Sequence, residues 1–174
     1  RPWSTVVHKR IANMQGGVMN RTLTAIAGLC LATTAAAQEV APPDVAFDDM
    51  GAVAVSLSGA PGDAAAGQEV MTTRGLGNCV ACHQVSALEA AFQGNVGPSL
   101  DGTGSRWDEA QLRGIVADAK MTFPDTVMPS FYKVSGYIRP GDAYTGKAGK
   151  EPLPPLLTAQ QIEDVVAYLT TLQD

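Results

Sequence analysis

The sequence contains no apolar run long enough to span a membrane. Residues 23–32 carry no charge, but they are far fewer than the roughly 20 apolar residues that a membrane-spanning helix needs. Arg21 precedes this run and small residues ending at Ala37 follow it, which is the pattern of a secretory signal peptide with an A-x-A cleavage site. The sequence therefore predicts an exported protein that is cleaved before Gln38 and has no membrane anchor.

The chain also lacks an initiating methionine. It starts with Arg1, and an export signal can be read only from Met14 or Met19. We expect residues 1–18 to be a non-native leader and residues 19–37 to be the signal peptide. Because the signal is of the secretory kind, the mature protein is expected in the periplasm.

Basic residues are scarce after position 37. Eight Lys and Arg residues follow that position together with all seventeen Asp and Glu residues, which gives a net charge of −9. An acidic protein of this kind is not expected to bind nucleic acid or anionic lipid, whereas it can dock to basic patches on other proteins. The eight basic residues are Arg74, Arg106, Arg113, Lys120, Lys133, Arg139, Lys147 and Lys150.

Histidine is scarcer still. His8 precedes the expected signal, so that His83 is the only histidine of the mature chain. Coordination of one metal ion by two histidines of this chain is therefore excluded. A zinc site would also lack the further Cys or His ligands that it needs.

Three helices, separated by Gly- and Pro-rich loops, are expected after residue 61. Asp63 can accept hydrogen bonds from the amides of a first turn, which predicts a helix over residues 62–74. Apolar residues at helical spacing predict a second helix over residues 107–120. Thr158 and Gln161 form a capping box for the last helix, and an apolar stripe follows them. The stripe consists of Ile162, Val165, Val166, Leu169 and Leu172.

Two further segments have no clear helical pattern. In the extension over residues 38–61, the alternation of Val53, Val55 and Leu57 is compatible with either a short strand or an apolar strap. Residues 134–157 are rich in glycine and proline and predict a long loop, which only a functional or wrapping role would explain.

The pentapeptide Cys79-Val80-Ala81-Cys82-His83 is the attachment signature of c-type haem. Two thiols on one turn add to the two vinyl groups of the porphyrin, and the neighbouring imidazole then faces the iron. The alternatives are a chance occurrence, half of a zinc site, or a thioredoxin-like redox pair, for which the βαβ context is absent. We expect one covalently attached haem c, with His83 as an iron ligand.

The second axial ligand is left with few candidates. It must be a methionine, a lysine, an N-terminal amine or nothing, since no further histidine exists. Met128 is the preferred ligand because Pro129 stiffens the irregular loop that contains it, and the aromatic residues Phe131 and Tyr132 can wall the haem edge. The remaining methionines after position 37 are Met50, Met71 and Met121, and Met121 is the main rival.

The stretch Gly94-Asn95-Val96-Gly97-Pro98-Ser99-Leu100 can bring a backbone carbonyl to the other nitrogen of the iron-bound imidazole. At these residues the chain resembles class I cytochromes c, in which a Gly-Pro-x-Leu stretch supplies that carbonyl. The resemblance implies that Pro98 is the hydrogen-bond partner of His83. It also implies an all-α class I cytochrome c fold over residues 62–174, with the N-terminal extension and the long Gly/Pro-rich loop before the C-terminal helix. In that fold, Gly67 and Tyr168 look like the crossing of the first and last helices.

A closer resemblance is to the SoxX family, the monohaem cytochrome c subunits of thiosulfate-oxidising SoxAX complexes. It implies a heterodimer with a SoxA-type cytochrome, whose cysteine-ligated haem is the catalytic centre, and transient contacts with a SoxYZ carrier protein and a downstream electron acceptor. The complex joins thiosulfate oxidatively to a carrier cysteine, so this chain would transfer electrons and contribute no catalytic residue. The stretches that carry the resemblance are Phe47-Asp48-Asp49, Ser56-Leu57-Ser58-Gly59-Ala60-Pro61-Gly62-Asp63, Gly77-Asn78-Cys79, residues 94–102 and Met128-Pro129-Ser130-Phe131-Tyr132.

Two other functions stay open at this stage. The chain is also compatible with a free monohaem carrier between respiratory complexes, and with a haem sensor that has an open or displaceable ligand position. Arg106, Trp107 and Arg113 are candidates for contacts with the haem propionates, because partly buried carboxylates need hydrogen-bond donors.

Overall fold

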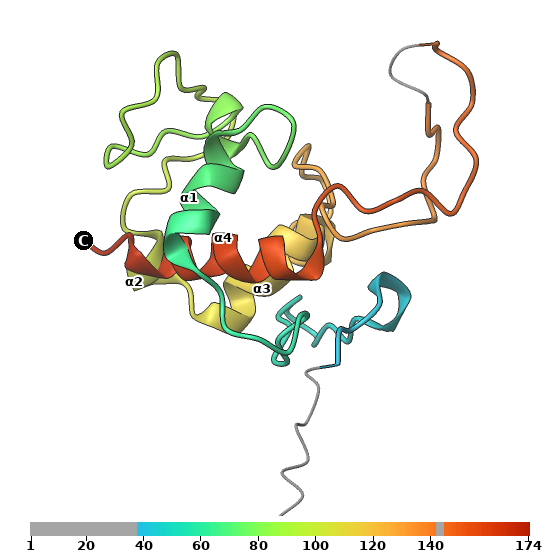
Figure 1. Ribbon diagram of the computed structural model, residues 1–174, viewed down its shortest axis with the longest axis horizontal. Coiled ribbons are helices and arrows are strands. Elements are labelled where there is room, and N and C mark those ends of the chain that lie inside the picture. The colour runs from blue at the N-terminus through green and yellow to red at the C-terminus, as the bar shows by residue number, and fades with distance from the viewer. Residues whose placement is uncertain (1–37, 142–144) are drawn as a thin grey trace, which may run out of the picture. The chain divides into compact units, whose positions relative to one another are not determined.

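The computed structural model describes residues 38–141 and 145–174, and the expected leader and signal peptide lie outside this part. Its α-helices are α1 (Ala64–Thr72), α2 (Thr103–Arg106), α3 (Glu109–Asp118) and α4 (Ala159–Thr171), shown in Figure 1. Short 3₁₀ helices are η1 (Pro42–Asp44), η2 (Cys79–Ala81) and η3 (Ala119–Met121). The described residues contain no strand beyond an isolated bridge between Gly141 and Ala148, so the all-α prediction is confirmed. No helix among them has both the length and the apolar character needed to cross a membrane.

Helix α1 has the Asp63 cap that the sequence predicts, but it begins at Ala64 and ends at Thr72, two residues inside the expected range at each end. The side chain of Asp63 accepts hydrogen bonds from the amides of Ala65 at 2.8 Å and Ala66 at 2.9 Å. The helix ends at Thr72 because the chain turns back, with the amides of Gly77 and Asn78 both donating to the carbonyl of Val70. This turn carries the chain directly into η2.

Helices α1 and α4 cross at a glycine. A β-carbon on Gly67 would overlap the carbonyl oxygen of Asp164 and lie 3.0 Å from Cβ of Tyr168. The missing side chain therefore allows the two backbones to approach, as the family resemblance implied. Figure 1 shows α4 running across α1 and beside α3.

Capping boxes begin both α3 and α4. The box of Thr158 and Gln161 was predicted, whereas that of Asp108 and Gln111 was not. Because Asp108 is the cap, α3 starts two residues later than expected, and its last turn tightens into η3. The apolar stripe of α4 is buried in the core.

The sequence left a short strand and an apolar strap open for the extension over residues 38–61. The structure has no strand there, and the extension is a strap. Val53 and Leu57 are buried, while Val55 is 67% exposed. The strap is fastened by the amide of Val53, which donates to the carbonyl of Ala110 at 2.9 Å, and by the amide of Leu57, which donates to Glu163 Oε1 at 2.7 Å. The extension is thus packed into the helical domain.

Candidate haem site

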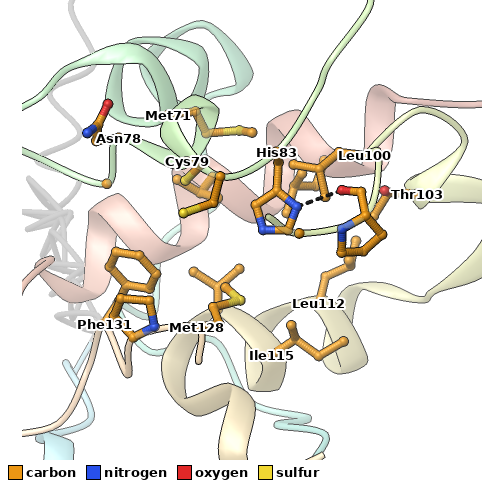
Figure 2. A pocket seen from close by; sticks show the side chains of 18 of the residues that line it. Met71, Asn78, Cys79, His83, Leu100, Thr103, Leu112, Ile115, Met128 and Phe131 are labelled. Carbon is orange, nitrogen blue, oxygen red and sulfur yellow. Dashed lines mark hydrogen bonds between the residues drawn. The ribbon is translucent and has the colours of Figure 1, made fainter. Parts of the chain in front are cut away.

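A cavity of about 970 Å³ lies between the end of α1, the loop after η2, helix α3 and the segment that contains Met128. Figure 2 shows Cys79 and His83 on one side of it, with Met128 and Ile115 across from them. Most of its walls are apolar side chains, including Leu112, Val116, Leu157, Val165 and Leu169.

The turn η2 brings both thiols and the imidazole of the attachment motif to this cavity. The amides of Cys82 at 3.0 Å and His83 at 2.9 Å both donate to the carbonyl of Cys79, which closes one turn. Both cysteines are free of disulfide bonds and line the cavity together with His83. Thiols on one turn facing one hollow are the arrangement that double attachment of a porphyrin requires.

The environment of Cys79 does not support a redox role for the pair. Burial, opposed by a backbone hydrogen bond and assisted by the nearby Cys82, raises the pKa of the Cys79 thiol to about 11. A reactive redox cysteine needs its thiolate stabilised, which is the opposite shift. Nor does any group of three or more Cys, His, Asp and Glu residues in the described part of the chain form a metal site of its own.

The ring of His83 is held by the backbone of Gly97 and Pro98. Its Nδ1 atom lies 2.7 Å from the carbonyl oxygen of Pro98, so the nitrogen carries the proton and donates it. The second ring nitrogen is left to face the cavity (Figure 2). Gly97 packs on the other side, where a β-carbon would overlap the imidazole. The ring is therefore oriented before any ligand binds.

Met128 approaches the cavity from the opposite wall. Its amide donates to Thr126 Oγ1 at 3.2 Å, and its carbonyl accepts from Lys120 Nζ at 2.7 Å. Two residues later, Ser130 Oγ donates to Asp118 Oδ1 at 2.6 Å. The structure thus fixes the backbone on both sides of Met128 and directs a half-buried thioether inward.

The other methionines are less well placed. Met71 lines the cavity but is fully buried on α1, beside Cys79 in Figure 2. Met121 and Met50 are 49% and 73% exposed and do not line the cavity. The geometry favours Met128 over its rival Met121.

These residues fit a covalently held haem. The cavity is at the upper end of the range of about 300–1,000 Å³ for ligand pockets and mostly apolar, as a porphyrin requires. It has two thiols and a cavity-facing imidazole nitrogen on one wall and a soft thioether on the other, which is a donor set suited to haem iron.

Comparison with known families matches residues 64–173 to cytochrome c. This chain belongs to the cytochrome c family. Among solved structures, it is similar to a chain in the crystal structure of SoxXA from P. pantotrophus, with 61% identity and a TM-score of 0.76, covering 79% of this chain and 100% of that chain. It also matches ferric cytochrome c-550 from Paracoccus versutus at 25% identity and a TM-score of 0.33, covering 65% of this chain and 99% of that one. No curated protein matches it.

One of the three expected propionate contacts of this cytochrome c, Arg113, is wrong. Arg106 and Trp107 line the cavity, but Arg113 does not. Arg113 is buried, and its Nε donates to Glu163 Oε1 at 2.8 Å while its Nη1 donates to the carbonyl of Val53 at 2.9 Å. It cannot reach a propionate, because its donors are used to join α3, α4 and the strap.

Arg74 is a rim residue that sequence reasoning missed. It is exposed and lines the cavity just after α1, in a turn without any motif that points to a ligand. Arg106 is partly engaged, donating from Nη1 to the carbonyl of Asp101 at 2.7 Å. Both cations line the cavity and are donors of the kind that the carboxylates of a bound haem would need.

The two aromatic residues after Met128 have separate roles in this cytochrome. Phe131 lines the cavity, but Tyr132 turns away and its hydroxyl donates to the carbonyl of Val40 at 2.8 Å. Burial, together with the charge of Glu39, raises the pKa of Tyr132 to about 12. Phe123 also lines the cavity, and its ring packs edge to face on Trp107 with the ring centroids 6.1 Å apart.

Proposed function

We propose that this chain is the electron-transfer haem subunit of a SoxAX-type complex, which couples thiosulfate oxidatively to a cysteine of a SoxYZ carrier protein. The observation that carries the proposal is the 61% identity to a chain of SoxXA over all of that chain. The haem-sized cavity with its attachment motif supports the electron-transfer role.

In this proposal, Cys79 and Cys82 hold one haem c through thioether bonds, and His83 and Met128 ligate its iron. The haem, when bound, supplies a one-electron ferric/ferrous couple. The carbonyl oxygen of Pro98 accepts a hydrogen bond from His83 Nδ1, which keeps the proton on that nitrogen and leaves the other nitrogen free to bind the metal. Because a thioether is a soft, neutral donor that favours ferrous iron, the His and Met pair raises the reduction potential above that of two histidines.

The apolar walls would exclude water from a bound haem, and with His83 and Met128 both bound to its iron there would be no open position for a substrate. This chain then contributes no catalytic side chain, and the joining of thiosulfate to the carrier cysteine takes place at the haem of a SoxA-type partner. That step releases two electrons, and the haem held by this chain would supply the one-electron couple that passes them singly to a downstream acceptor. In this proposal, the strap over residues 38–61 and the long loop before α4 provide binding surface for the partner in the heterodimer.

The proposal places the mature heterodimer in the periplasm, after cleavage of residues 19–37. A mass measurement of the exported protein tests processing and haem attachment together, because it reports both the new N-terminus and the bound porphyrin. A colourless product from cells with working haem-attachment machinery would contradict the assignment.

The functional test is reduction of this haem by thiosulfate. The haem-loaded protein is mixed with thiosulfate and SoxYZ, with and without the SoxA-type partner, and haem absorbance is followed. We expect rapid reduction only when the partner and a SoxYZ with its carrier cysteine are both present. A monomer that never binds the partner would instead be a free carrier.

A further inference from the structure

The positive charge of this acidic protein is concentrated in one loop. Half of the eight basic residues after position 37 lie in residues 133–151, namely Lys133, Arg139, Lys147 and Lys150. With Asp142 and Glu151, this segment has a net charge of +2, whereas the rest of the chain after position 37 carries −11. We call its two described limbs, residues 133–141 and 145–151, the basic arm. An asymmetry of this size predicts an electrostatic role for the arm.

The basic arm is held together by contacts within itself. Glu151 on one limb accepts hydrogen bonds from the amides of Gly136 at 3.2 Å and Tyr137 at 2.9 Å on the other. The amide of Gly149 donates to the carbonyl of Pro140 at 2.8 Å. These bonds join limb to limb, and at the base of the arm Lys133 Nζ lies 4.0 Å from Asp118 Oδ2 at the end of α3. In Figure 1 the arm extends away from the helices before the chain returns to α4.

The outer part of the arm presents one apolar side chain among the cations. Ile138 is 97% exposed. Arg139 follows it on the same limb, and Lys147 and Lys150 lie on the other limb, which the bridge between Gly141 and Ala148 joins to the first; all three cations are exposed. A structured loop of this length with no helix is uncommon in a compact domain unless it has a function. An exposed apolar anchor surrounded by charge is the composition of a protein-binding surface.

The position of the arm separates it from electron transfer. No residue of the arm lines the haem cavity. A protein can therefore contact the arm without touching the residues that line the cavity. The arm is also shaped by its own hydrogen bonds, so that binding costs less conformational entropy than ordering a free loop would.

We propose that the basic arm docks on an acidic surface of the haem-bearing partner subunit, with Ile138 seated in an apolar pocket and Arg139, Lys147 and Lys150 paired with carboxylates. This inference rests on the proposed function, since it names the surface through which the heterodimer forms. A long-lived partner is favoured over the carrier because the arm is built away from the haem.

The test is the affinity of the haem-loaded protein for the isolated SoxA-type subunit. The triple variant Arg139→Glu, Lys147→Glu, Lys150→Glu should bind at least about tenfold more weakly at low salt, and the difference should shrink as salt screens the charges. The matched control Arg139→Lys, Lys147→Arg, Lys150→Arg keeps the charge and should bind within about twofold of the wild type. The haem spectrum and the melting temperature of both variants should match those of the wild type.

A separate variant, Ile138→Ser, tests the apolar anchor. It should dissociate at least about fivefold faster with little change in the association rate. Charges at the rim of an interface mainly affect the association rate, whereas buried contacts mainly affect the dissociation rate. This variant keeps the inference open to refutation if the triple variant fails to fold.

The outcomes distinguish the two proposals. If the wild-type protein does not bind the SoxA-type subunit, the proposed function fails. If the wild type binds and both the charge reversal and Ile138→Ser bind equally well, only the docking role of the arm is overturned. If the charge reversal slows reduction through SoxYZ while affinity for the SoxA-type subunit is unchanged, the assigned partner is wrong.

Discussion

Lys120 donates a hydrogen bond from Nζ to the carbonyl oxygen of Met128, at 2.7 Å. The bond ties η3, the short helix that follows α3, to the segment that directs the thioether into the cavity. Lys120→Met keeps the length of the side chain but removes the donor, so the Met128 loop should loosen, at a cost of about 1 kcal/mol in free energy of unfolding. The weak near-infrared absorption of a sulfur-to-ferric-iron bond should fall, and Lys120→Arg should restore it. Unchanged absorption in Lys120→Met would show that the lysine does not position the ligand.

Met128→Ala should remove that near-infrared absorption completely, because the thioether across from His83 is lost. Met121→Ala is the matched control, since Met121 is 49% exposed and does not line the cavity. Carbon monoxide should shift the spectrum of reduced Met128→Ala but hardly that of the wild type. The opposite pattern would make Met121 the ligand, and a wild type that binds carbon monoxide readily would favour a sensor.

Gly97→Ala should disturb the imidazole that we propose binds the iron, because the new methyl group would overlap the ring of His83. We expect a loss of about 1–3 kcal/mol in the free energy of unfolding and a reduced yield of haem-loaded protein. Gly75→Ala is the control, since nothing lies within 4 Å of a β-carbon there. Denaturant unfolding and the ratio of haem absorbance to protein give both quantities. Equal stability of the two variants would contradict the packing assigned to Gly97.

Glu163→Gln should be the most damaging single charge removal. It leaves Arg113 buried without its main counter-ion and weakens the bond to the Leu57 amide in the strap, at a cost of about 3–5 kcal/mol. Glu109→Gln removes the other carboxylate that contacts Arg113, but this side chain is 65% exposed and its loss should cost about 0.5 kcal/mol or less. Similar melting temperatures for the two variants would show that the buried pair of Arg113 and Glu163 does not hold the strap in place.

Tyr132 makes stability depend on pH in the alkaline range. Its pKa is raised from 10.0 to about 12 in the folded protein, first by burial and then by Glu39. Between these values the unfolded chain loses the tyrosine proton while the folded chain keeps it, so stability falls as pH rises through this window. The loss attributable to this residue should be on the order of 1–2 kcal/mol. Denaturant unfolding on either side of the window measures it, and Tyr132→Phe should flatten the dependence. An equal decline in that variant would assign the effect to other groups.

Several features of this protein follow from residues close together in the chain. The attachment motif needs two thiols and an imidazole on one turn, so Cys79, Cys82 and His83 could be identified from their spacing alone. The capping box of Thr158 and Gln161 is likewise a contact between residues three apart, and it located the start of α4. The second capping box, at Asp108, has the same physical basis, but the predicted helix was placed from Trp107 on its apolar spacing and the box was overlooked.

Tertiary packing decided what spacing could not. Met128 and Met121 are both plausible ligands in sequence, and only the fold directs one to the cavity and the other to solvent. Arg113 resembled a propionate contact, but its partner Glu163 lies 50 positions away and comes within reach only when α3 packs beside α4. Local patterns therefore determined the attachment motif and the helix caps, because those interactions act within one or two turns. The direction in which each charged or sulfur-bearing side chain points was determined by the packing of distant segments, because burial sets the free energy of placing it on one side or the other.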